Sequence, residues 1–170
     1  MNTRILTAAI VTGTLGLAGC KSKAPEDLPP QPVTTVSTPT QATQPAGPVL
    51  GTQQHFVNAV NGQNVIYFDT DRFNIDSQDA AALQTQAQYL LQYTNLTATV
   101  EGHADERGTR DYNLALGERR ANAAKNYLVS LGIPASRLGT VSYGKERPVA
   151  LGSNEQAWAQ NRRAVTVIVN

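Results

Sequence analysis

Apolar and polar residues alternate with two different periods from about residue 60 onward. Runs rich in β-branched and aromatic residues predict four strands, at 64–69, 97–101, 138–143 and 164–169. Between them, apolar residues recur every three or four positions, which predicts helices. The first begins at Asp76 or Ser77 and ends near 93–95, the second covers 112–131, and a short third covers 155–160. The sequence therefore predicts an α+β domain of β-α-β-α-β order, extended by a short helix and a last strand.

Each long helix and the last strand is predicted to have one apolar face. The second helix ends at Gly132, with Pro134 as a further stop signal. The apolar positions of these faces are Leu83, Ala87, Leu90 and Leu91; Leu116, Ala123, Tyr127 and Leu131; and Val165, Val167 and Val169.

The most polar segment of the domain joins the second strand to the second helix. Seven of the nine residues from His103 to Asp111 carry hydrogen-bonding or charged side chains, and Gly108 indicates a turn. Binding sites are commonly built on loops that a strand and a helix hold in place. We therefore place the candidate site here.

The first twenty residues have the pattern of a bacterial lipoprotein signal peptide. Arg4 precedes an apolar run at 5–17, which is too short to span a bilayer, and the segment ends in Leu-Ala-Gly-Cys. Cys20 is the only cysteine, so it has no partner for an internal disulfide. A general secretory signal is the alternative. We predict that residues 1–19 are removed and that acyl chains on Cys20 anchor the protein to a membrane.

Residues 20–51 are predicted to form a flexible linker, and residues 52–170 a single domain. The linker is rich in Pro, Thr and Gln and has almost no large apolar residues, so it cannot offset the entropy of ordering. The formal net charge of the chain is +1, and no basic run indicates a nucleic-acid partner.

Neither catalysis nor metal binding is predicted. Asp105 and Glu106 are neighbours on one short loop, whereas glycosidases place two carboxylates about 5–10 Å apart across the bond. The sequence has no nucleophile elbow and no P-loop. His103 matches no strong metal-ligand spacing, so we expect a polar residue at a strand end and no cofactor.

Asp105 and Arg120 are the residues with the strongest case for binding. Arg120 follows Leu116 by four residues and Asn113 by seven, so all three share a helix face beside the loop that carries Asp105. A carboxylate and a guanidinium together suit a ligand that has both an ammonium and a carboxylate. On these residues alone, an internal salt bridge between Asp105 and Arg120 is an equal alternative. Asn113 either starts the helix or orients the site.

The second helix and its flanking motifs resemble the OmpA-like peptidoglycan-binding domain. The family pattern N-x-x-L-S-x-x-R-A-x-x-V is met by Asn113, Leu116, Arg120 and Ala121, with Gly117 for Ser and Ala124 for Val. The motifs GHADERGT, VSYGKERP and NRRAV are similar to the peptidoglycan-associated lipoprotein branch. The resemblance covers the chain from about residue 60 and implies a mixed sheet with helices packed on one face. The residue pattern does not fix the strand order.

The resemblance also implies a ligand and roles for individual residues. In the family, the residues that match Asp105 and Arg120 hold the diaminopimelate side chain of a peptidoglycan stem peptide. The backbone N–H groups that match Asp71 and Leu116 meet its carboxylate. Thr70 stands where an aromatic residue is common, which weakens any stacking role at that position.

The function implied is non-catalytic. The resemblance implies a lipid-anchored protein of the outer membrane that faces the periplasm. Such a protein tethers this membrane to the cell wall within the Tol–Pal system, which serves cell division and envelope integrity. Lys21 after the lipidated cysteine favours outer-membrane sorting. A TolB-like propeller protein is the implied protein partner. A wall-binding lipoprotein of the same family that serves a different envelope machine is the alternative.

Overall fold

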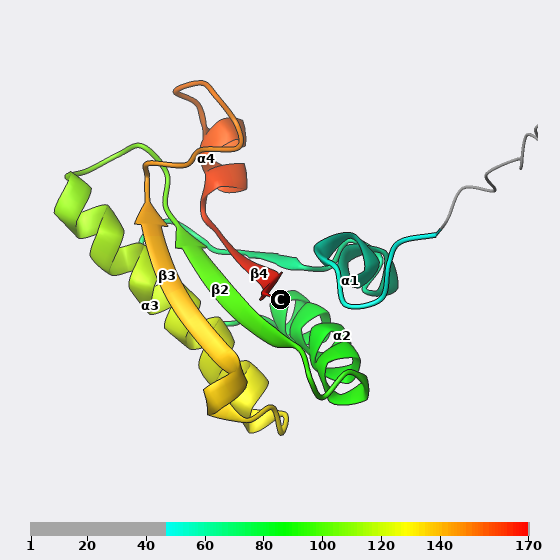
Figure 1. Ribbon diagram of the computed structural model, residues 1–170. Helices are drawn as coiled ribbons and strands as arrows, with labels where there is room; N and C mark the ends of the chain where they lie inside the picture. Colours follow the sequence, from blue (N-terminus) through cyan, green and yellow to red (C-terminus); the bar gives the residue numbers. More distant parts are fainter. Residues whose placement is uncertain (1–46, 170) are drawn as a thin grey trace, which may run out of the picture. The chain divides into compact units, whose positions relative to one another are not determined.

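The computed structural model describes residues 47–169. Its elements are α1 (Gln53–Ala59), β1 (Val65–Tyr67), α2 (Ser77–Gln92), β2 (Thr97–His103), α3 (Arg110–Ser130), the 3-10 turn η1 (Ala135–Arg137), β3 (Leu138–Gly144), α4 (Glu155–Asn161) and β4 (Arg163–Val169) (Figure 1). The predicted signal peptide (1–19), Cys20 and most of the predicted linker (20–51) lie outside the described residues.

The four strands form one mixed sheet in the order β1-β4-β2-β3. β4 runs antiparallel to both β1 and β2, whereas β2 and β3 run parallel, as the two arrows in Figure 1 show. The predicted α+β class and mixed sheet are confirmed, and the structure adds the strand order. Because β4 lies between β1 and β2, the carboxyl ends of β1, β2 and β3 meet the start of β4 at one edge of the sheet.

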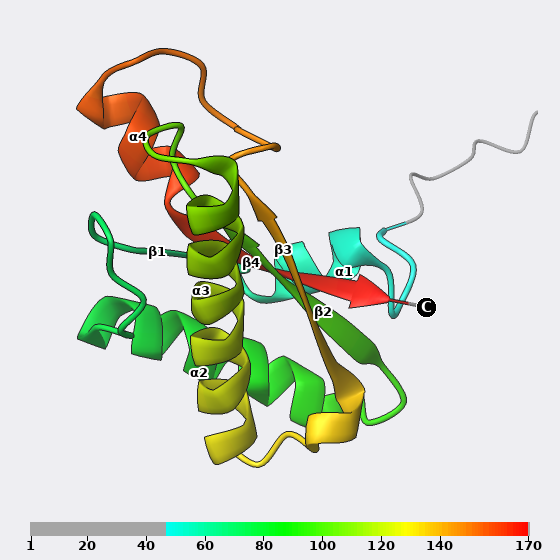
Figure 2. The same cartoon turned by 90° about the vertical axis from the view of Figure 1, so that its left-hand side faces the viewer.

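Helices α2 and α3 cover one face of this sheet, as predicted (Figure 2). On this face, buried residues of β2 pair in register with buried residues of β4. These pairs are Ala98 with Ile168, Val100 with Thr166, and Gly102 with Ala164. From α2, the buried side chain of Gln86 accepts a hydrogen bond from the Thr166 hydroxyl (2.6 Å).

A glycine pair brings α3 unusually close to β2. A methyl group at Gly102 would lie 1.8 Å from the carbonyl oxygen of Gly117, and one at Gly117 would lie 2.4 Å from Ser142 Oγ. The Ser142 hydroxyl occupies this space and donates to the Leu114 carbonyl (2.7 Å). Packing thus explains why this chain has Gly117 where the family pattern has serine. The contact also fixes the start of α3 beside the end of β2.

The predicted apolar face of α3 is confirmed in part. Leu116 is buried, and Tyr127 and Leu131 are half-buried against the core. Ala123 is only half-buried, and the more deeply buried neighbours Ala124 and Leu128 were not predicted. The buried face includes two polar residues, so hydrophobic periodicity could not locate it. The buried residues of α3 are Asn113, Leu116, Gly117, Arg120, Ala121, Ala124 and Leu128.

One apolar assignment in α2 needs correction, since Leu91 is exposed. The three valines of β4 share one face of the strand, as predicted, and this is the less buried face, on which Val169 is exposed.

The sequence analysis did not predict α1, which has seven residues and one buried side chain, Phe56. The amide of Gln53 in this helix donates to the Thr166 carbonyl (3.3 Å) and accepts from the Ile168 N–H (2.7 Å). It thereby satisfies backbone groups of β4 that the three-residue β1 does not reach. Within residues 47–169, no helix is long and apolar enough to cross a bilayer.

Candidate functional site

Three segments enclose a cavity of about 240 Å³ at the edge of the sheet where β1 and β2 end. The loop after β1 contributes Thr70 and Asp71. The loop after β2 contributes Asp105, Arg107 and Gly108, and α3 contributes the remaining side chains. These are Tyr112, Asn113, Leu116 and Arg120. All five residues predicted for the site therefore line a single cavity.

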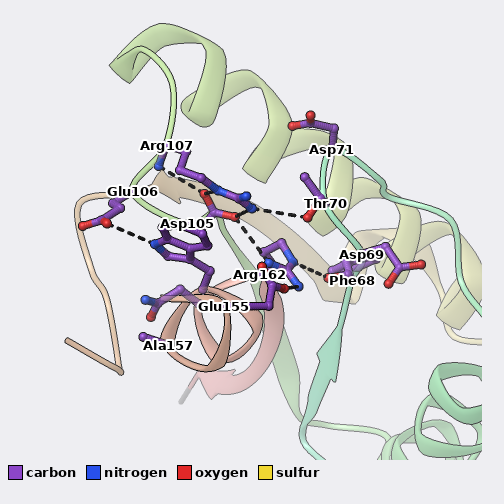
Figure 3. Close-up of polar contacts among 12 residues, drawn as sticks. Phe68, Asp69, Thr70, Asp71, Asp105, Glu106, Arg107, Glu155, Ala157 and Arg162 are labelled. Carbon is purple, nitrogen blue, oxygen red and sulfur yellow. Dashed lines mark hydrogen bonds and ion pairs between the residues drawn. The ribbon is translucent and has the colours of Figure 1, made fainter. Parts of the chain in front are cut away.

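Asp105 lies between two arginines at one side of this cavity (Figure 3). Its Oδ2 is 2.6 Å from Arg107 Nη2 and 3.5 Å from Arg162 Nη1. Its Oδ1 accepts hydrogen bonds from Arg107 Nε (3.0 Å) and from the Arg107 backbone N–H (3.1 Å). Burial acts to raise the pKa of this carboxyl, but the hydrogen bonds from Arg107 and the two positive charges outweigh it and lower the pKa. Asp105 is therefore ionised at neutral pH.

Arg120 of α3 also lines the cavity, and its side chain is fully buried. Its three nitrogens each donate to a backbone carbonyl, with Nε bonded to Arg72 (2.9 Å), Nη1 to His103 (2.8 Å) and Nη2 to Asp69 (3.0 Å). Its guanidinium carbon lies 5.2 Å from the centre of the Phe68 ring. Burial lowers the pKa of Arg120 to about 10, which leaves the group charged at neutral pH.

Arg120 has no carboxylate within ion-pair distance among residues 47–169. The internal salt bridge to Asp105 that the sequence left open is not formed, since Asp105 pairs with Arg107 and Arg162 instead. The two terminal nitrogens of Arg120 each carry a second N–H beyond the one used for a carbonyl. Among residues 47–169, this buried positive charge contacts carbonyl groups and the Phe68 ring, while Asp105 and Asp71 act on it only from beyond ion-pair distance. A ligand anion beside Arg120 would supply the direct partner that it lacks.

Asp71 and Leu116 occupy two different walls of the cavity. Asp71 has a positive φ of 56° and accepts a hydrogen bond from the Tyr112 hydroxyl (3.0 Å), which ties the loop after β1 to the first turn of α3. Leu116 is the seventh residue of α3, beyond the first turn whose N–H groups are free. Leu116 is among the residues that line the cavity.

The loop after β2 is fixed by side chains that bind its carbonyl groups. Asn113 donates to the carbonyls of Arg107 (2.7 Å) and Thr109 (3.1 Å). Lys145 donates to those of Glu106 (3.2 Å) and Gly108 (2.7 Å). Thr109 is the N-cap of α3 and accepts from the Tyr112 N–H. Of the two roles considered for Asn113, orientation of the loop fits these contacts.

Comparisons with known proteins identify the family of this chain. The model of the OmpA family matches residues 67–162, which is more than half of the chain. The chain belongs to the OmpA family. A peptidoglycan-associated lipoprotein from Rhizobium meliloti is 50% identical over 155 residues, covering 91% of this chain and 82% of that relative. One from Agrobacterium fabrum is 57% identical over 118 residues, covering 69% of this chain and 66% of that relative. The predicted resemblance to peptidoglycan-associated lipoproteins is confirmed.

Two solved structures share the fold. The crystal structure of the peptidoglycan-associated lipoprotein from Burkholderia pseudomallei is 44% identical and has a TM-score of 0.63, covering 67% of this chain and 99% of that one. The C-terminal domain of Helicobacter pylori MotB is 18% identical with a TM-score of 0.57, and covers 62% of this chain and 84% of that one. At that identity the second match shows the fold alone.

Two arginines outside the predicted set of site residues pair with Asp105. Arg107 follows Asp105 by two residues and lines the cavity, whereas Arg162 lies at the entry to the last strand. In the structure it also reaches Asp105, because the start of β4 lies between the ends of β1 and β2. The same guanidinium donates to the Phe68 carbonyl (2.9 Å) and to Glu155 of α4 (2.7 Å) (Figure 3). No local signal indicates this contact, since 57 residues separate Arg162 from Asp105.

His103 closes β2 and is buried against the Tyr143 ring, whose centre lies 5.5 Å from its own. Burial, together with the positive charges of Arg163 and Arg147, lowers the pKa of His103 to about 4, so the ring is neutral at neutral pH. Among the described residues, no cluster of three or more His, Cys, Asp or Glu side chains is arranged to hold a metal ion. His103 instead contributes its carbonyl, which binds Arg120.

Proposed function

We propose that this protein is a non-catalytic envelope lipoprotein whose domain binds the diaminopimelate side chain of a peptidoglycan stem peptide in the cavity between α3 and the loops after β1 and β2. The single observation that carries the proposal is the charge arrangement of the lining. Arg120 is a buried cation without an acidic partner among residues 47–169, and Asp105 is an ionised carboxylate in the same cavity. Such an arrangement suits a ligand end that carries one charge of each sign.

The lining contains two carboxylates, Asp71 and Asp105, and two guanidinium groups, Arg107 and Arg120. A zwitterionic side-chain end can place its carboxylate at Arg120 and its ammonium at Asp105 without leaving a net buried charge. A purely cationic end would leave the buried charge of Arg120 without an anion, which is costly in a partly buried site. The balance of charge therefore favours the zwitterion.

The size of the cavity also fits this ligand. Pockets that enclose drug-sized molecules commonly measure about 300–1,000 Å³. A volume of about 240 Å³ is smaller, and it suits one side-chain end while the rest of the wall polymer stays outside. Each contact is then weak by itself, and many anchored copies acting on one polymer would supply the overall strength through avidity.

The place of the protein in the cell follows from the N-terminal pattern and the relatives. The lipobox ending at Cys20 supports an acyl anchor, and Lys21 supports sorting to the outer membrane with the domain facing the periplasm. The relatives named peptidoglycan-associated lipoprotein support a tether between this membrane and the wall within the Tol–Pal system, with a TolB-like propeller protein as partner and a role in cell division and envelope integrity. A related wall-binding lipoprotein serving another envelope machine is the alternative.

Co-sedimentation with purified cell-wall sacculi tests the binding function. The full-length protein in non-ionic detergent would be spun with sacculi that contain diaminopimelate and, separately, with sacculi that contain lysine at the same position. We expect the protein to pellet with the first and to stay largely in solution with the second. Asp105→Asn should abolish pelleting. Arg110→Gln is the matched control, because Arg110 is exposed and pairs only with Glu146 (3.4 Å). A folded protein that pellets with neither material would refute the proposal.

A further inference from the structure

Arg107 occupies the part of Asp105 that a ligand ammonium would need. Its guanidinium meets both carboxylate oxygens, with Nη2 2.6 Å from Oδ2 and Nε 3.0 Å from Oδ1. This two-point contact is the strongest form of arginine–carboxylate pair. A cation can therefore reach Asp105 only by displacing Arg107.

Contacts with two further residues hold the Arg107 side chain in place beside Asp105. Its guanidinium carbon lies 4.2 Å from the centre of the Trp158 ring of α4, and its Nη2 donates to Thr70 Oγ1 (3.2 Å) in the loop after β1. Trp158 is itself fixed by a hydrogen bond from its indole N–H to Glu106 (3.0 Å). These contacts come from three segments, so the position of Arg107 at Asp105 is built into the fold.

The two partners differ in their access to water. The side chain of Arg107 is 38% exposed, whereas that of Asp105 is 9% exposed. Arg107 can therefore turn outward into the cavity, while Asp105 stays in place with Arg162 behind it at 3.5 Å. The pair can open without unfolding the loop, because the loop is held by the separate contacts of Asn113 and Lys145.

Resting on the proposed function, we propose that Arg107 is a specificity-determining residue that admits a side-chain end carrying both an ammonium and a carboxylate and disfavours one carrying an ammonium alone. A zwitterionic end replaces both members of the ion pair that it breaks. Its ammonium takes the place of Arg107 at Asp105, and its carboxylate gives the displaced guanidinium, together with Arg120, a new anion. The ammonium of a lysine end takes the place of Arg107 at Asp105 but brings no carboxylate. The displaced guanidinium of Arg107 is then left without an anionic partner.

The other carboxylate of the lining does not remove this selectivity. Asp71 already accepts a hydrogen bond from the Tyr112 hydroxyl (3.0 Å), so a displaced Arg107 would have to share it. Its carboxylate also lacks the fixed two-point geometry that Asp105 has with Arg107. The exchange with a zwitterion conserves charge-assisted bonds, and the exchange with lysine loses them.

Calorimetric titration with two stem peptides tests the proposal. The peptides differ only in having diaminopimelate or lysine at the same position, and the proteins are the full-length wild type, Arg107→Gln, Arg107→Lys and Arg110→Gln in non-ionic detergent. We expect Arg107→Gln to lower the diaminopimelate-to-lysine affinity ratio by about tenfold or more, mainly through tighter lysine binding. Arg107→Lys should give an intermediate ratio, because it keeps the charge and loses the fork. Arg110→Gln removes the same charge near the loop and should leave the ratio unchanged.

The possible failures of the two proposals are distinguishable. If Arg107→Gln is folded and binds the diaminopimelate peptide with the wild-type ratio, the selectivity role of Arg107 is refuted and the binding function stands. If the folded wild type binds neither peptide, the binding function is refuted and the role of Arg107 with it. Thermal unfolding of each variant establishes that it is folded.

Discussion

Arg120 and Arg162 are both buried arginines at the same edge of the sheet, yet their charges are treated in opposite ways. Arg162 has two carboxylates within reach, Glu155 at 2.7 Å and Asp105 at 3.5 Å. Arg120 has three backbone carbonyls and, among residues 47–169, no carboxylate within ion-pair distance. Burying a cation costs free energy unless it is paired with an anion. Among the described residues, Arg162 has such partners and Arg120 does not.

The comparison separates a structural cation from one that is available to a ligand. Arg162 connects the residue after β1, helix α4 and the loop after β2, and the carboxylates of Glu155 and Asp105 pair with its charge. Arg120 joins the loop after β1 to the end of β2 through carbonyls alone, and it lines the cavity. Both arginines are buried, so burial and residue type do not distinguish them. Arg120 is the candidate ligand-binding residue because it has no carboxylate within ion-pair distance among residues 47–169.

The largest effect is expected from Arg120→Met. The substitution leaves three carbonyls without their donor, at a cost of roughly 1–3 kcal/mol each, partly offset because a buried charge is removed. We expect a loss of about 3 kcal/mol in the free energy of unfolding and a fall in diaminopimelate-peptide affinity of at least about thirtyfold. Urea unfolding and calorimetry measure the two quantities. An affinity within about threefold of wild type would mean that Arg120 serves the fold alone.

Acid should lower the free energy of unfolding in two different pH ranges, one set by His103 and one by Asp105. The folded pKa of His103, whose carbonyl binds Arg120, is about 4 against 6.5 in the unfolded chain. The unfolded chain therefore takes up the proton first, and stability that is complete above pH 6.5 is lost as the pH falls toward 4, by about 3 kcal/mol. Against the effect of burial, the hydrogen bonds and positive charge of Arg107 hold the pKa of Asp105 below its ordinary value of 3.8, so the contribution of Asp105 to stability is present above that pH and is lost only as the pH falls further.

The variant His103→Leu should remove the loss of stability between pH 6.5 and 4 and keep the loss at lower pH that Asp105 causes. Neither ring nitrogen of His103 has a hydrogen-bond partner within residues 47–169, so an apolar side chain suits the site. Urea unfolding across pH 3–7 measures the difference between the variant and the wild type. A wild-type free energy of unfolding that stays flat between pH 6.5 and 4 would contradict the burial of a neutral histidine beside Arg120.

The smallest effect is expected from Glu155→Gln, on the Arg162 side. The carboxylate of Glu155 is 64% exposed, and such ion pairs contribute about 1 kcal/mol or less. Arg162 keeps Asp105 and the Phe68 carbonyl, so peptide affinity should change by less than about twofold. Thermal unfolding and calorimetry measure both. A loss of peptide affinity as large as that of Arg120→Met would show that the compensation of Arg162 controls the site.

Most elements of the fold could be predicted because each has a local cause, whereas α1, with its single buried side chain, was not predicted. Asp76 caps α2, as one of the two predicted cap residues, and the strands lie within a few residues of the predicted ranges. The buried face of α3 could not be predicted, since Asn113 and Arg120 lie on it and make it look polar. The site residues were found through the family pattern. The contact between Asp105 and Arg162 was not, because Arg162 reaches Asp105 only when β4 is inserted between β1 and β2.

The most direct test of the central claim compares lysine substitutions at the two arginines, since lysine keeps the charge and loses the planar fork. The affinity of the full-length protein for a diaminopimelate stem peptide would be measured by calorimetry for wild type, Arg120→Lys and Arg162→Lys. We predict a loss of about tenfold or more for Arg120→Lys and a change of less than about threefold for Arg162→Lys. Equal losses at both positions, or wild-type affinity for Arg120→Lys, would contradict the claim that the uncompensated charge of Arg120 holds the ligand.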